Sequence, residues 1–139
     1  MNFTEATDAV AKHVVAGWVS GGSPRTDIAI EGETPPYKPG DAAYITLAFR
    51  GGGVPSRTLG STGNRKYTRS GVLIVQIFTP LSGEGQKPCN VLADHIKDLL
   101  ESPVTGLVEL VDCEINAVGA EKGYYQINAS VRFVYEEVK

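Results

Sequence analysis

The segment from Arg65 to Gly85, RKYTRSGVLIVQIFTPLSGEG, constrains the fold more than any other part of the chain. A basic lead-in runs into the apolar run VLIVQIF, and Pro80 ends it because proline cannot continue a strand ladder. A Gly-rich turn follows, after which a helical pattern begins. The sequence therefore predicts a long strand over Arg65–Thr79, with its apolar end buried on both faces, leading into a helix.

Two amphipathic helices are predicted. Apolar residues at helical spacing indicate the first over residues 4–16, with Thr4 as its N-cap and acidic residues in its first turn. The second covers residues 87–101, and Ser102–Pro103 ends it. Its apolar stripe is formed by Cys89, Leu92, Ala93, Ile96, Leu99 and Leu100.

Four further strands are predicted from alternation and apolar runs: Asp27–Glu31, Ala42–Arg50, Val108–Val118 and the last strand from Tyr124 to Glu136. The last is the clearest, because apolar and polar residues alternate along it, which is typical of an antiparallel strand with one polar face. Gly32–Asp41 holds three prolines and is expected to be an irregular connection.

This order of elements predicts an α+β fold, in which two helices pack on one side of a mostly antiparallel twisted β-sheet. Residues 1–139 are expected to form a single domain. The strands 42–50 and 65–79 are expected to form an antiparallel pair. The basic Gly-rich stretch Gly51–Asn64 between them is too long for a tight hairpin, so it is predicted to be a long loop.

Charge is unevenly distributed along the chain. Between Ala42 and Gly83 there is no Asp or Glu, but five basic residues occur there. The formal net charge is −3, so the remainder of the chain carries −8. The five basic residues are Arg50, Arg57, Arg65, Lys66 and Arg69.

The composition is that of a soluble globular protein, with 42% hydrophobic and 21% charged residues. No apolar run approaches the roughly 20 residues that span a bilayer, and the first ten residues do not resemble a signal peptide. The two cysteines, Cys89 and Cys113, form no CxxC pair and are expected to be reduced packing residues. We therefore expect synthesis in a reducing compartment.

Motifs for catalysis, cofactors and metals are not recognisable in the sequence. Gly60–Lys66 departs from the phosphate-loop pattern, because its glycines are too close and a strand follows it. His13 and His95 lie on separate helices without a second ligand at metal spacing, and Cys89 is placed unsuitably for a Cys–His pair. No pair of carboxylates has the opposed environments that acid–base catalysis requires. The chain is therefore expected to be neither an enzyme nor a cofactor or metal protein.

Three interpretations of the basic window remain. It can be a solvated loop, a nucleic-acid-binding patch, or one side of a contact between subunits. The acidic remainder would repel a polyanion, which favours the contact between subunits. The residues predicted for a subunit or tube interface are Arg50, Arg57, Arg65, Lys66, Tyr67 and Arg69.

The order of motifs resembles the tail terminator, or tail-completion, proteins of long-tailed bacteriophages. The resemblance spans nearly the whole chain and rests on order and spacing. Its central part is Arg65 followed by Tyr67-Thr68 and Gly71, then Val75-Gln76-Ile77-Phe78 with Pro80, Gly83-x-Gly85, and a helix bearing Leu92-Ala93-Asp94-x-Ile96. Glu31 with Pro35-Pro36 before Tyr44–Leu47, and Gly123-Tyr124-Tyr125 before the last strand, are similar to the family's two ends.

The resemblance implies a virion structural protein, made in the host bacterial cytoplasm, that forms a hexameric ring in the tail or neck. Such a ring caps the tail tube, stops its polymerisation and provides the docking surface for the head. The implied partners are the tail tube protein and the head-completion or neck proteins. DNA would pass through the lumen without specific binding, and no membrane is involved. A negative lumen, with the basic window at a protein contact, is the expected arrangement. A head–tail connector ring and a basic-loop nucleic-acid-binding domain are the alternatives.

Overall fold

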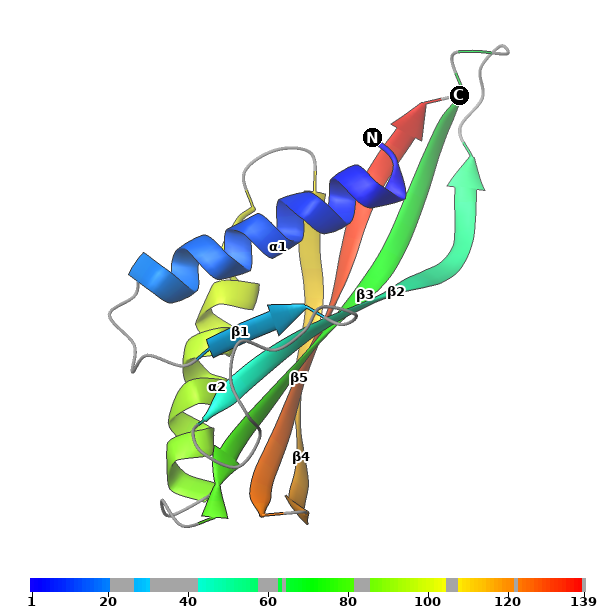
Figure 1. Cartoon of the computed structure of the whole chain (residues 1–139). Helices are drawn as coiled ribbons and strands as arrows, with labels where there is room; N and C mark the ends of the chain where they lie inside the picture. The colour runs from blue at the N-terminus through cyan, green and yellow to red at the C-terminus, as the bar shows by residue number, and fades with distance from the viewer. Residues whose placement is uncertain are drawn as a thin grey trace.

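The computed structural model describes residues 1–20, 27–30, 43–57, 63, 65–81, 86–104, 108–121 and 123–138. Two helices pack on one side of a five-stranded sheet (Figure 1). The strand order is β1-β2-β3-β5-β4, and only the β1–β2 pair is parallel. The predicted fold class is confirmed. The elements are α1 (Phe3–Ser20), β1 (Asp27–Ile30), β2 (Tyr44–Arg57), β3 (Lys66–Pro80), α2 (Gln86–Leu100), β4 (Val108–Glu121) and β5 (Tyr124–Val138).

Helix α1 begins with a reciprocal cap that the sequence analysis misplaced. The Asn2 side-chain Oδ1 accepts a hydrogen bond from the Glu5 N–H at 2.9 Å, and Glu5 Oε2 accepts one from the Asn2 N–H at 3.3 Å. This is a capping box, which satisfies two N–H groups that the helix cannot pair itself. The predicted N-cap, Thr4, was therefore wrong: Asn2 is the cap, and Thr4 already lies within the helix.

The two helices approach closely at Gly17. A Cβ atom added there would lie 2.3 Å from Leu99 Cδ2, which is inside van der Waals contact. Nearby, the Trp18 ring packs edge-on against His95, with the ring centroids 5.1 Å apart. Helix α1 thus continues through Gly17 to Ser20, four residues beyond its predicted end, because its last turn packs against α2.

Strand β3 lies in the centre of the sheet and has two different faces. Leu73, Val75 and Ile77 are fully buried against the helices, whereas the residues between them are only partly buried. The expectation that VLIVQIF is buried on both faces was therefore wrong. Helices cover one face only, so the other face retains some exposure to solvent.

Strand β2 is longer than predicted. It continues through the three glycines to Arg57, and it pairs with β3 as far as Arg57 opposite Tyr67. The register shifts between Gly52 and Ser56, where a β-bulge takes up the irregular sequence. The predicted loop over Gly51–Asn64 was therefore wrong in its first half. Residues 58–62 and 64 lie outside the described part of the chain.

Phe133 fills the core at one end of the helix layer. Its ring is fully buried and packs against Phe3, Phe49 and Tyr135, with centroids 6.1–6.2 Å away. Gly71 is opposite Phe133 on β3, and a Cβ atom there would lie 2.3 Å from Phe133 Cζ. Glycine at this position therefore makes room for the aromatic ring.

The last strand and Cys89 agree with expectation. Ile127, Ala129, Val131 and Phe133 are buried in alternation with less buried neighbours. Cys89 is a free, buried thiol on α2, and its Sγ donates to the Ile77 carbonyl at 3.5 Å. Burial raises the pKa of this thiol, and a hydrogen bond with Thr79 opposes the rise. Cys89 therefore acts as a packing residue.

Candidate subunit interface

Strands β2, β3 and β5 continue past the start of α1 as a narrow arm (Figure 1). We define the arm as Ser56–Arg57, Lys66–Arg69 and Glu136–Val138, which pair with one another in register. Strand β4 does not accompany it, because the pairing of β4 with β5 stops at Val108 opposite Tyr135. The arm is therefore a three-stranded extension of the sheet.

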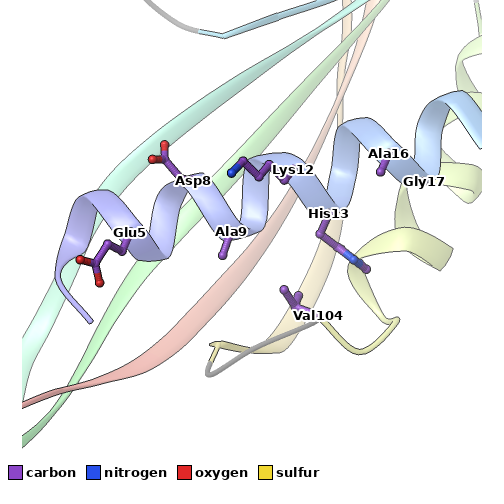
Figure 2. A pocket seen from close by; sticks show the side chains of 8 residues that line it. All are labelled: Glu5, Asp8, Ala9, Lys12, His13, Ala16, Gly17 and Val104. Carbon is purple, nitrogen blue, oxygen red and sulfur yellow. The ribbon is translucent and has the colours of Figure 1, made fainter.

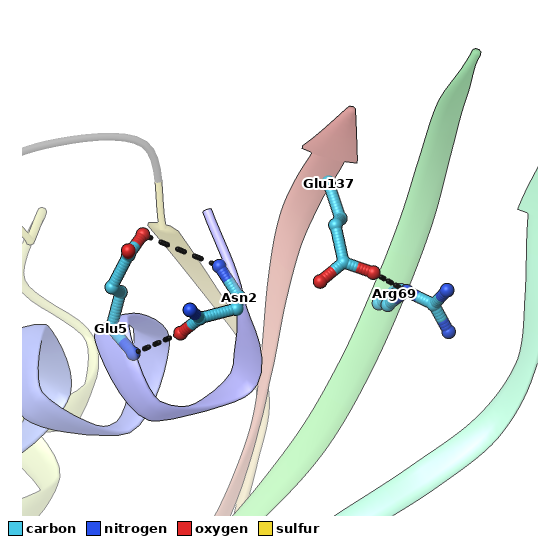
Figure 3. A network of polar contacts seen from close by, with 4 residues as sticks. All are labelled: Asn2, Glu5, Arg69 and Glu137. Atoms are coloured by element: carbon cyan, nitrogen blue, oxygen red, sulfur yellow. Dashed lines mark hydrogen bonds and ion pairs between the residues drawn. The ribbon is translucent and has the colours of Figure 1, made fainter. Parts of the chain in front are cut away.

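Arg69 is bound within its own chain. Its Nε lies 2.7 Å from Glu137 Oε1 (Figure 3). Its guanidinium carbon lies 5.1 Å from the centroid of the Tyr67 ring. The side chains are 29% and 15% exposed for Arg69 and Glu137. Burial and the Glu137 charge raise the pKa of the neighbouring Tyr135 hydroxyl, whereas Arg69 lowers it. The acidic end of β5 thus balances part of the basic charge of β3.

The six predicted interface residues do not form one patch. They lie on both faces of the sheet, and some of them lie outside the arm. Alternation along β3 directs Tyr67 and Arg69 to the side of the helices and the exposed Lys66 to the opposite side. Arg50 is exposed on the helix-free face, outside the arm, and its Nη1 donates to the Phe49 carbonyl at 2.9 Å. The partly buried Arg65 precedes β3, and Arg57 is opposite Tyr67.

A row of uncharged polar residues crosses the helix-free face, and the sequence analysis missed it. Thr46, Gln76, Asn128 and Asn116 are opposite one another on four adjacent strands. The Thr46 hydroxyl donates to Gln76 Oε1 at 2.9 Å, and Gln126 Nε2 donates to Asn128 Oδ1 at 2.8 Å. The sequence feature that could have revealed this row is Gln76, the one amide within the apolar run VLIVQIF. It lies opposite Asn128, a residue of the polar face of the last strand.

An aromatic cluster lies beside this polar row. The Tyr44 and Phe78 rings stack with centroids 4.6 Å apart, and Tyr124 meets both rings edge-on at 5.4 and 6.2 Å. Tyr124 is 7% exposed although it lies on the helix-free face. Burial raises the pKa of the Tyr44 hydroxyl, and the neighbouring Tyr124 raises it by a smaller amount. The Tyr44 phenol is therefore neutral at physiological pH.

Strand β4 forms an acidic edge of the sheet. Its sequence, VELVDCEINAVGAE, contains four acidic residues and no basic one. Two bulges interrupt it, with Asp112 at φ 58° and Gly119 at φ 107°. Asp112 Oδ2 lies 3.1 Å from Arg132 Nη2 on β5, so this carboxylate is paired within the chain. Between the bulges, residues 114–118 are all exposed.

A groove lies between α1 and Val104, which follows α2 (Figure 2). Its volume is about 740 Å³, and Glu5, Asp8, Ala9, Lys12, His13, Ala16, Gly17 and Val104 line it. His13 Nε2 lies 2.9 Å from the Leu99 carbonyl oxygen, which fixes the imidazole against α2. The histidine therefore connects the two helices, and its contact with the Leu99 carbonyl oxygen occupies Nε2 of the imidazole.

The described residues hold no group of three or more His, Cys, Asp or Glu side chains arranged for a metal ion. The phosphate-loop candidate Gly60–Lys66 lies mostly outside those residues. In the same part of the chain, no helix is long and apolar enough to cross a membrane.

No protein-family model matches the chain, and a search of curated proteins found no match. Solved structures share its fold. One that carries no functional name is 14% identical with a TM-score of 0.69, and the alignment covers 98% of this chain and 97% of that one. A chain of the virion of a native gene transfer agent particle is 12% identical with a TM-score of 0.50, and 94% and 93% of the two chains are covered. At these identities the likeness establishes the fold.

Proposed function

We propose that this chain is a virion structural protein, a tail terminator that forms a ring on the end of a phage-like tail tube. The observation that carries the proposal is the likeness of almost the whole chain to a subunit of a gene transfer agent virion. The resemblance of the sequence motifs to tail terminators independently points in the same direction.

The geometry of the chain is suited to assembly. The basic residue Lys66 of the arm and Arg65, which precedes it, lie at one end of the sheet, whereas β4 presents an acidic edge. Unlike charges at different places on one subunit favour a head-to-tail contact, which closes into a ring when the rotation allows it. Exposed ion pairs contribute only about 0–1 kcal/mol each, so they set the register while strand pairing and apolar contact supply the affinity.

The proposed relation to DNA is passage without specific binding. The chain has a net charge of −3, which opposes adsorption of a polyanion. The basic residues are instead assigned to contacts with neighbouring subunits or with the tail tube protein. No catalytic role is proposed for the groove along α1 or for the arm.

The test combines the mass of the assembly with its effect on tubes. Purified protein is measured by light scattering and then added to growing tubes of the tail tube protein encoded in the same genome. The proposal predicts a hexamer, or a monomer that assembles on tube ends, and tubes that stop growing. A dodecamer that leaves tube growth unchanged would favour a head–tail connector. Tight binding to duplex DNA with a steep salt dependence would favour a nucleic-acid-binding domain.

A further inference from the structure

The sheet has two strand edges without partners among the described residues. One is β4, which pairs with β5 on one side only, with two bulges along its 14 residues. The other is the distal part of β2, because β1 covers only Tyr44–Leu47. An edge of this length presents unpaired backbone N–H and C=O groups, so it is a template for another strand. Natural proteins shield such edges or use them for pairing.

The two edges have opposite charge. β4 carries four acidic residues and no basic one, whereas β2 carries Arg50 and Arg57 and no acidic residue. Pairing β4 with the β4 of a second copy would bring two acidic strands together, which cross-strand repulsion disfavours. Pairing β4 with the β2 edge of a second copy brings unlike charges together. Charge therefore selects the head-to-tail contact.

Strand direction agrees with this choice. The β2–β3, β3–β5 and β5–β4 pairs are all antiparallel, so β4 runs opposite to β2 within one chain. Rotation about a ring axis roughly parallel to the strands preserves strand direction. In such a ring, β4 of one copy meets β2 of the next in the antiparallel orientation, and the alternation of the sheet continues across the contact.

The charged side chains also share a face. Glu114 lies in the same cross-strand row as Ala48, and Glu109 in the same row as Gly52. Arg50, between these two β2 positions, alternates to the same helix-free face.

We propose that β4 of one copy pairs antiparallel with the Ala48–Gly52 edge of β2 in a second copy, with Glu109 and Glu114 beside Arg50. The inference rests on the proposed ring and identifies the contact that closes it. The bulge between Gly52 and Ser56 limits the regular pairing to the part of β2 that precedes it.

Disulfide trapping tests this contact directly. In a Cys113→Ser background, the full-length chain carries either Ala48→Cys with Glu114→Cys or Gly52→Cys with Glu109→Cys, which are the pairs in the same cross-strand rows, and is oxidised mildly. A head-to-tail contact gives a ladder of dimers, trimers and larger covalent species on a non-reducing denaturing gel. Each variant with only one engineered cysteine is the matched control and stays below the trimer, since the remaining Cys89 is buried. Absence of a ladder from both double variants would overturn the proposal, since trapping also captures weak contacts.

Charge exchange gives a second readout. Glu109→Lys with Glu114→Lys is expected to weaken self-association by about tenfold or more, and adding Arg50→Glu is expected to restore part of it. Asp94→Lys with Asp98→Lys, on the exposed side of α2, changes the net charge equally and is expected to have no effect. Equal effects of the two pairs would contradict edge pairing.

The two proposals fail separately. A ring that assembles without a ladder would overturn the strand contact and leave the tail-terminator proposal intact. A ladder from a chain that does not stop tube growth would support the contact and overturn the function.

Discussion

Strand β3 passes through two regions of the molecule that differ in what surrounds them. From Leu73 to Ile77 its inward side chains are fully buried beneath two helices. From Lys66 to Arg69 no side chain is fully buried, and the contacts are an ion pair and a cation over a tyrosine ring. The backbone pairs with β2 and β5 in both regions.

This difference indicates how folding and assembly are divided along one strand. Burial of one Leu, Val or Ile side chain contributes about 1.5–3 kcal/mol, whereas an exposed ion pair contributes about 0–1 kcal/mol. The helix-covered region therefore supplies most of the stability. The arm is held by strand pairing and charge, so its outer surface is available for contacts with other chains.

The largest expected effect is in the buried region. Phe133→Ala removes a fully buried ring and should lower the free energy of unfolding by about 3–5 kcal/mol. Tyr67→Ala, an aromatic truncation in the arm, should cost roughly 1 kcal/mol, because Tyr67 is only partly buried. Urea denaturation measures both values. Equal losses would remove the distinction between the two regions.

The next largest loss of stability is expected at two glycines that lie opposite each other between the buried region and the arm, Gly51 on β2 and Gly71 on β3. Gly71→Ala places a Cβ 2.3 Å from Phe133 Cζ and should destabilise the protein by about 1–3 kcal/mol. Its cross-strand partner Gly51 is the control, since an added Cβ there meets nothing within 4 Å. Gly51→Ala should therefore be nearly neutral by the same denaturation assay. A neutral Gly71→Ala would show that the Phe133 ring moves aside without cost.

The cap of α1, which lies near the arm, should have a smaller effect. Asn2→Ala removes the side chain that accepts a hydrogen bond from the Glu5 N–H. It should lower the free energy of unfolding by about 1 kcal/mol, which is measured as a fall in the thermal midpoint. Thr4→Ala should cost little, because Thr4 lies inside the helix. A larger loss for Thr4→Ala than for Asn2→Ala would contradict the cap seen in the structure.

The smallest effect is expected within the arm. A double-mutant cycle with Arg69→Ala and Glu137→Ala should give a coupling energy of about 0.2–1 kcal/mol that falls as salt is added. Measurements of unfolding at low and high ionic strength give this value. A coupling above about 2 kcal/mol would mean that the ion pair helps to hold the fold together, so that the arm belongs to the core.

Local periodicity predicted most of the fold. The alternation of the last strand and the stripe of α2 specified which faces are buried, and both are confirmed. The extension of β2 through Gly51–Gly53 was missed because glycine has a low strand propensity. Pairing with β3 keeps these residues in the strand. The cap of α1 was missed by two residues because Asn2 and Thr4 are both good cap types.

The candidate site was less predictable. The basic window identified its residues, but their division between two faces depends on the register of β2 with β3. The pairing of Arg69 with Glu137 joins residues far apart in sequence, and only the β3–β5 register brings them together. The acidic edge of β4 depends on the strand order, which periodicity within single segments does not encode.

The most direct test of the central claim is the length distribution of tail tubes grown with the Arg65→Glu, Lys66→Glu variant and with the wild-type chain. The account predicts that the wild-type chain stops tube growth and that the variant does so much less, while its melting temperature stays within a few degrees of the wild type. A variant that stops tube growth as well as the wild type but melts several degrees lower would contradict the account, because the basic residues of the arm would then serve the fold.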